Sequence, residues 1–169
     1  ITQLVTGKRE MALAVGQKMR LLSEKTEKGR FLVLERYFHA MLAYMGHARD
    51  EKLAITLIPE YRNFQKEFQG RINKLYAGTN DFVIACFLQA VNKPQEAQFW
   101  IYRILNEEEE VLRPETILYT RVLQLITLYD SQESRFLAQA IRSGKEYMRR
   151  KKLQGAPEKM ILQYFQRLL

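Results

Sequence analysis

The sequence contains a single cysteine, Cys86, and only two histidines, His39 and His47. One cysteine cannot form an internal disulfide or a cysteine-rich zinc site. The two histidines would lie about 12 Å apart along one helix, which is too far for both to bind one metal ion. Glycine-rich phosphate loops and nucleophile elbows are also missing from the sequence. The composition therefore predicts no metal site, no cofactor and no enzymatic activity.

Proline, glycine and long apolar runs are scarce as well. The 4 Pro and 8 Gly leave little room for the frequent turns of an all-β fold. No apolar run reaches the roughly 18 residues of a membrane span, and no secretory signal is visible. Cys86 lies in the apolar run 82–88, a setting typical of a buried thiol. Because nothing indicates an oxidising compartment, we predict a cytoplasmic protein.

The sequence does contain clear signals for the beginnings of helices. Pro94, Pro114 and Pro157 are each followed by a glutamate within two residues, a pattern typical of the first turn of a helix. Between such signals, apolar residues recur at intervals of three and four. The pattern predicts an all-α fold of about eight helices, at 8–25, 30–46, 50–77, 80–92, 94–107, 114–130, 132–152 and 157–169.

Two details of the segment 50–80 shape this assignment. Pro59 lies inside a helical pattern, so we expect a kink or a restart of the helix there. Gly78 is expected to end the long helix, and Thr79, Asn80 and Asp81 to cap the next one. The short connections between helices predict that consecutive helices pack antiparallel.

The predicted helices are of two kinds. Some are apolar on nearly all sides, which requires neighbours on several sides; these are 30–46, 80–92 and 114–130. Others carry a single apolar stripe; these are 94–107, 132–152 and 157–169. Alternation of the two kinds is typical of stacked helical hairpins, whereas a simple bundle would give every helix one stripe.

The hairpins at 80–107 and 114–152 carry a resemblance to a known family. Their expected starts, Asn80 and Pro114, are separated by 34 residues, the period of tetratricopeptide repeats. In the first hairpin, the small and large packing positions of that motif are matched by Ala85, Leu88, Ala97, Ile101 and Ile104. The C-terminal half also resembles divergent tetratricopeptide-like repeats of bacterial proteins. The resemblance implies a short right-handed α-solenoid that binds other proteins on a concave face formed by the first helices.

The predicted organisation is a single helical repeat domain over 1–169. Its repeat-like hairpins are 30–77, 80–107 and 114–152, followed by a capping helix at 157–169. Because the chain begins at Ile1 without an initiator methionine, a C-terminal fragment of a longer protein is an alternative.

The leading functional hypothesis is a scaffold that binds a protein or peptide. Polar residues on helices covered from two sides are the candidates for groove contacts. These candidates are Arg36, His39, Gln89, Arg121 and Gln124.

Charge supports a second hypothesis. The net charge is +8 with an isoelectric point near 9.6, which attracts nucleic acid or acidic proteins. The C-terminal third holds a candidate basic patch of Arg142, Lys145, Arg149, Arg150, Lys151 and Lys152, which predicts contacts with RNA or DNA phosphates. A third hypothesis is an assembly domain whose first or last helix docks on a second copy or on the rest of a longer chain.

Overall fold

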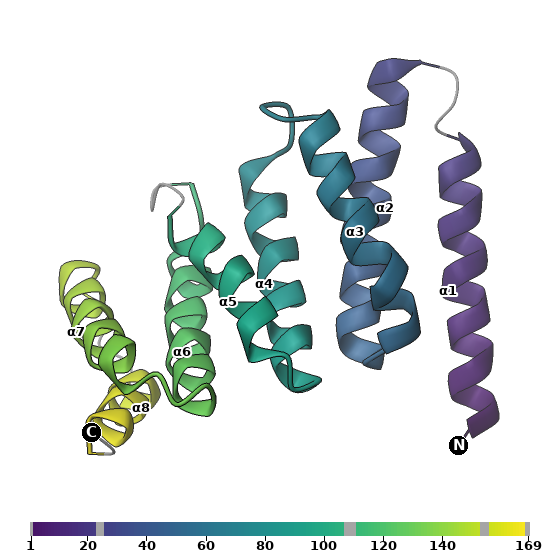
Figure 1. Ribbon diagram of the computed structural model, residues 1–169. Helices are drawn as coiled ribbons and strands as arrows, with labels where there is room; N and C mark the ends of the chain where they lie inside the picture. Colours follow the sequence, from purple (N-terminus) through teal and green to yellow (C-terminus); the bar gives the residue numbers. More distant parts are fainter. Residues whose placement is uncertain (1, 23–25, 107–110, 153–155, 168–169) are drawn as a thin grey trace. The chain divides into compact units, whose positions relative to one another are not determined.

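The computed structural model describes residues 2–22, 26–106, 111–152 and 156–167 (Figure 1). These residues form helices and no strand. The helices are α1 (Thr2–Leu22), α2 (Glu27–Ala48), α3 (Glu51–Glu67), α4 (Lys74–Ala90), α5 (Pro94–Leu105), α6 (Pro114–Asp130), α7 (Ser134–Arg150) and α8 (Ala156–Arg167). The prediction of an all-α fold with eight helices is confirmed, although residues 23–25, 107 and 168–169 of the predicted helices lie outside the described residues.

The chain divides into two compact units, Ile1–Tyr76 and Ala77–Leu169. In the first unit, α2 packs against both α1 and α3, as expected for a helix that is apolar on nearly all sides. Each of its two hairpin helices has a side-chain cap. Thr26 Oγ1 accepts a hydrogen bond from the Gly29 N–H at the start of α2, and Asp50 Oδ1 accepts one from the Leu53 N–H at the start of α3.

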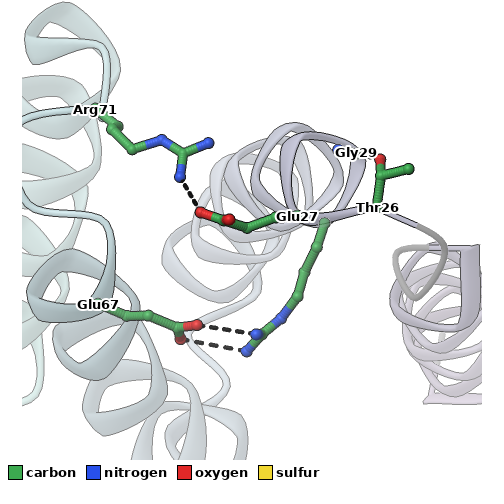
Figure 2. A network of polar contacts seen from close by, with 6 residues as sticks. Thr26, Glu27, Gly29, Glu67 and Arg71 are labelled. Atoms are coloured by element: carbon green, nitrogen blue, oxygen red, sulfur yellow. Dashed lines mark hydrogen bonds and ion pairs between the residues drawn. The ribbon is translucent and has the colours of Figure 1, made fainter.

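Charged residues join the beginning of α2 to the end of α3 (Figure 2). Arg30 forms a two-pronged ion pair with Glu67, at 2.9 and 3.3 Å, and Arg71 pairs with Glu27. Both guanidinium groups also lie over the ring of Phe68, at 5.9 and 5.5 Å from its centroid. Because all four charged side chains are exposed, solvent weakens the ion pairs, and the stacking on the buried ring fixes where the arginines lie.

The predicted helix 50–77 is wrong in its second part. The helix runs through Pro59 without restarting but ends at Glu67, and Gly70 adopts a left-handed backbone with φ of 79°. A new helix, α4, begins at Lys74, where Asn73 Oδ1 accepts a hydrogen bond of 2.9 Å from the Leu75 N–H. The cap of α4 is therefore Asn73, seven residues before the expected one.

The residues that were expected to separate two helices lie inside α4. Asn80 and Asp81 are 3% and 4% exposed, and Gly78 is an interior helical position. An added Cβ at Gly78 would lie 2.4 Å from Leu112 Cδ2. Gly78 is thus needed for close packing, and it does not end a helix.

The second unit is built from two successive hairpins and α8. Helix α6 packs against α5, α7 and α8, and it is joined to α4 by the hydrogen bond from Thr127 Oγ1 to Gln89 Oε1, at 2.8 Å. The expectation that 114–130 is covered on several sides is confirmed. Its neighbour α7 has one buried side and one exposed polar side, which confirms the alternation of helix kinds for this pair.

The two hairpins of this unit repeat with a period of 40 residues. Helices α4 and α6 begin at Lys74 and Pro114, and α5 and α7 begin at Pro94 and Ser134. The predicted spacing of 34 residues is wrong because it was counted from Asn80, which is inside α4.

The turns inside the two hairpins repeat with the same period, and equivalent residues form equivalent hydrogen bonds. The N–H of Lys93 donates to Leu88 O at 2.9 Å, and the N–H of Glu133 donates to Leu128 O at 2.9 Å. Asn92 and Gln132 precede these donors, and each has a φ of 58°. Both turns therefore end a helix with a left-handed residue in the manner of a Schellman motif.

This equivalence predicts that Gln132→Gly stabilises the protein by about 1 kcal/mol, since glycine adopts the left-handed region without steric cost. Asn92→Gly, at the same position of the preceding hairpin, should give a smaller gain because asparagine tolerates that region better than glutamine. Urea unfolding followed by circular dichroism measures both. A larger gain for Asn92→Gly, or a loss for Gln132→Gly, would contradict the assignment of the turn.

Candidate functional site

A cleft in the second unit is lined by α5, α6 and α7 and has a volume of about 390 Å³. Two exposed aromatic rings lie on its opposite flanks, Tyr102 on α5 and Phe136 on α7, at 41% and 51% exposure. The side of α6 that faces the cleft contributes Arg121, Gln124 and Leu128. The cleft therefore combines aromatic edges with a floor on which the polar Arg121 and Gln124 lie beside the apolar Leu128, a composition suited to holding a ligand in one orientation.

The three cleft residues of α6 share one face because of helical spacing. Positions 121, 124 and 128 are separated by three and four residues, which places them one above the other on a helix. Arg121 is held in place from two sides. Its Nη1 donates a hydrogen bond of 2.7 Å to Ser143 Oγ on α7, and its guanidinium lies 4.9 Å from the ring centroid of the buried Tyr147. This positive charge is consequently fixed at the cleft.

Side-chain amides supply the remaining hydrogen-bonding capacity. Asn106, Gln124 and Gln139 come from α5's C-terminal cap, from α6 and from α7 respectively. Each amide offers both a donor and an acceptor. Such groups can pair with the N–H and C=O groups of an extended peptide, which needs both kinds of partner.

The five predicted groove residues are not gathered in one place. Arg121 and Gln124 line the cleft, but most of its lining comes from the second helices α5 and α7 and not from the first helices, which were expected to form the groove. Gln89 instead links helices, because it accepts a hydrogen bond from Thr127 and donates one to Asp130. Its side chain is occupied in holding α4 to α6.

Arg36 and His39 belong to the first unit, where both lie against Tyr76. Arg36 Nη1 donates a hydrogen bond to the Tyr76 hydroxyl, and its guanidinium lies 4.8 Å from the centroid of that ring. The ring of His39 is 5.0 Å from the same ring. Arg36, His39 and Tyr76 thus form a surface cluster of their own.

A second cleft, of about 490 Å³, lies at the turn between α6 and α7 and contains none of the predicted residues. Its two carboxylates already have partners. Asp130 accepts a hydrogen bond from Gln89, and Glu133 accepts one from Gln98 at 3.1 Å. These groups serve the packing of the two hairpins on each other, so the cleft between α5, α6 and α7 is the better candidate site.

The side chains of the predicted basic patch do not all lie on one side of α7. Arg142, Lys145 and Arg149 lie on the exposed side of α7, since they are spaced by three and four residues. Arg150 points elsewhere, with its guanidinium 5.8 Å from the ring centroid of Tyr147. Lys151 is half-buried, and Lys152 is exposed in a left-handed conformation after the end of the helix.

Three other features bear on function: clusters that could bind a metal ion, the cysteine thiol and helices that could span a membrane. Among the described residues, no three His, Cys, Asp or Glu side chains gather closely enough to hold a metal ion. Cys86 is half-buried and not fully buried as expected, and this burial raises the pKa of its thiol to about 11, so the thiol is protonated at neutral pH. Within the described part of the chain, no helix has the length and apolar character needed to cross a membrane.

Sequence reasoning missed the aromatic and amide residues that complete the cleft. Tyr102, Phe136 and Gln139 are on α5 and α7, the helices with a single apolar stripe, whereas the five predicted groove residues are all on helices that were expected to be covered from two sides. An exposed aromatic residue on an otherwise polar helix side was the available signal. Comparison with protein-family models, curated proteins and solved structures finds no match.

Proposed function

We propose that this chain is a non-catalytic scaffold of helical hairpins, of the tetratricopeptide type but with a 40-residue period, that binds an extended segment of a partner protein. The single observation that carries the proposal is the cleft between α5, α6 and α7, with aromatic flanks and both polar and apolar side chains between them. Its volume of about 390 Å³ is at the lower end for ligand pockets, enough for the side chains of a short stretch of peptide.

The chemistry of the cleft specifies the peptide. An apolar side chain of the partner packs between Tyr102 and Phe136, since exposed aromatic rings are frequent anchors in protein interfaces. An acidic side chain of the partner is attracted by Arg121, which is held at the cleft by Ser143 and Tyr147. The expected partner segment therefore has an acidic residue close to an apolar one, and the net charge of +8 favours its approach.

The experiment selects peptides from a random library with the intact chain and measures the affinity of an enriched peptide. We expect enriched sequences to share the acidic and apolar pair, and Phe136→Ala to weaken binding about tenfold or more, because truncating an aromatic anchor removes over about 1.4 kcal/mol. Gln139→Glu should also weaken binding by repelling the acidic residue, while leaving the fold unchanged, since Gln139 is exposed.

Phe99→Ala is the matched control. Phe99 is an exposed aromatic residue of α5, at 47% exposure, and it does not line the cleft. Its truncation should leave the peptide affinity within about twofold. Equal losses in Phe99→Ala and Phe136→Ala, or a library that yields no shared sequence, would reject the cleft as the binding site.

A further inference from the structure

The exposed side of α7 carries a line of positive charge. Arg135, Arg142 and Arg149 are exposed and follow one another at seven-residue intervals. Seven residues are close to two full helical turns, so these arginines lie in a row with a spacing of about 10 Å. Lys145 stands beside the row, three residues after Arg142 and four before Arg149. The helix thus presents four cations on one side.

This charge is not neutralised within the described part of the chain. The side chains of Arg135, Arg142 and Arg149 form no ion pair or hydrogen bond with another described residue. Glu146 is the one acidic residue of α7, and it lies on the same side without pairing with any of them. The row therefore keeps a net positive charge that is available to a ligand.

Helix α8 extends this surface. Lys145 Nζ donates a hydrogen bond to Gln166 Oε1 on α8, and Gly144 allows a close approach, since a Cβ there would lie 3.2 Å from Leu162 Cδ2. From this seam the exposed face of α8 continues through Gln163 and Arg167 to Tyr164 on its far edge. We define the α7–α8 basic surface as Arg135, Arg142, Lys145, Arg149, Gln163, Tyr164, Gln166 and Arg167, all of which are exposed.

Tyr164 gives this surface a feature beyond charge. Its side chain is 60% exposed, and its ring meets the ring of the buried Phe165 edge to face, at a centroid distance of 5.7 Å. Phe165 in turn contacts Tyr129 of α6, at 5.9 Å. An exposed ring on a fixed support is a platform on which an unpaired nucleobase can stack.

We propose that the α7–α8 basic surface binds single-stranded nucleic acid, with the phosphates on the arginine row and a base on Tyr164. Arginine suits this ligand because its planar group pairs with phosphate through two hydrogen bonds. A lipid bilayer fits less well, since Gln139, Ser143 and Glu146 lie between the cations of α7, and its exposed aromatic residue, Phe136, belongs to the lining of the cleft. Gln139 and Ser143 of α7 also line the cleft, but none of the eight residues that define this surface does, so variants of the two sites can fail independently.

The test measures the fluorescence anisotropy of a labelled single strand of uridine nucleotides, about 20 long, added to the intact chain. Binding should weaken with salt between about 50 and 200 mM, with a slope of about −0.7 in the logarithm of the binding constant for each phosphate contact. Arg142→Glu combined with Arg149→Glu should weaken binding about thirtyfold and reduce the slope by about 1.4, as two phosphate contacts are lost.

A matched variant separates this surface from net charge. Lys52→Glu combined with Lys66→Glu changes two exposed cations of α3. Each replacement removes two charges, so both double variants fall from a net charge of +8 to +4. The α3 variant should bind within about threefold of the parent. Equal weakening of the two variants would overturn the proposal, because attraction would then follow net charge alone.

Tyr164→Ala distinguishes stacking from phosphate binding. It should weaken binding about tenfold while leaving the salt slope unchanged, since a stacked base contributes without displacing counterions. The same strand in duplex form should bind more weakly than the single strand. The proposal would be overturned if the single strand did not bind at low salt. It would also be overturned if vesicles that contain phosphatidylserine bound more tightly than the single strand and their binding were equally weakened by Arg142→Glu and Arg149→Glu.

Discussion

Replacing Trp100 by alanine should lower the free energy of unfolding by about 3–5 kcal/mol. The side chain of Trp100 is 0% exposed, so its loss leaves a large cavity in the second unit. The ring also supports a polar contact, since the guanidinium of Arg103 lies 5.1 Å from its centroid and pairs with Asp81 at 3.3 Å. Because the side chain of Asp81 is only 5% exposed, loosening Arg103 weakens the interaction that offsets its burial.

Circular dichroism in urea is the appropriate measurement, because Trp100 is the one tryptophan of the chain and its removal abolishes tryptophan fluorescence. Trp100→Phe should cost about half as much, as it keeps an aromatic ring under Arg103. Phe99→Ala, one residue away but exposed, should stay within about 0.5 kcal/mol. Similar losses at Trp100 and Phe99 would show that the burial described for Trp100 is incorrect.

The parts of the fold that could be predicted from the sequence are those with local causes. Helices α5 and α6 begin at Pro94 and Pro114, as expected, because proline at the first position of a helix acts within one turn. The covering of α6 on several sides was also predictable, since a helix that is apolar on nearly all sides is stable only where neighbours cover several of those sides.

The break between α3 and α4 was missed although Gly70 and Asn73 are local signals for it. Phe68 and Ile72 continue the helical apolar pattern through the break, and the pattern alone favours one long helix. A tertiary contact also fixes the chain just before α4. The N–H of Asn73 donates a hydrogen bond of 3.1 Å to Oε1 of Glu35, a buried side chain 38 residues away in sequence. Because the start of α4 was predicted too late, the predicted 34-residue spacing was wrong as well.

The candidate site could be predicted only in part for a related reason. The sequence indicates which helices are covered but not which neighbour covers which side. Gln89 and Gln124 are both polar residues of covered helices, yet Gln89 faces Thr127 and Gln124 faces the cleft. Pairing of helices decides between these roles, and that pairing depends on contacts distant in sequence.

Phe64→Ala should lower the free energy of unfolding by about 3–5 kcal/mol. Phe64 is buried at the centre of an aromatic cluster in the first unit. Its ring centroid lies 5.0 Å from that of Phe38, 5.2 Å from that of Phe68 and 6.1 Å from that of Phe31. Because these rings belong to α2, α3 and the C-cap of α3, the substitution removes the side chain on which the packing of α2 on α3 is centred.

Phe64→Leu and Ile55→Ala are the controls, again measured by circular dichroism in urea. Leucine fills much of the same space, so Phe64→Leu should cost about 1–1.5 kcal/mol. Ile55 is another large apolar residue of α3, but it is 74% exposed, and its truncation should cost less than about 0.5 kcal/mol. A loss at Phe64→Ala no larger than that at Ile55→Ala would mean that the aromatic cluster does not hold α2 against α3. A loss at Phe64→Leu equal to that at Phe64→Ala would instead point to the aromatic ring contacts, and not the filled volume, as the source of the stability.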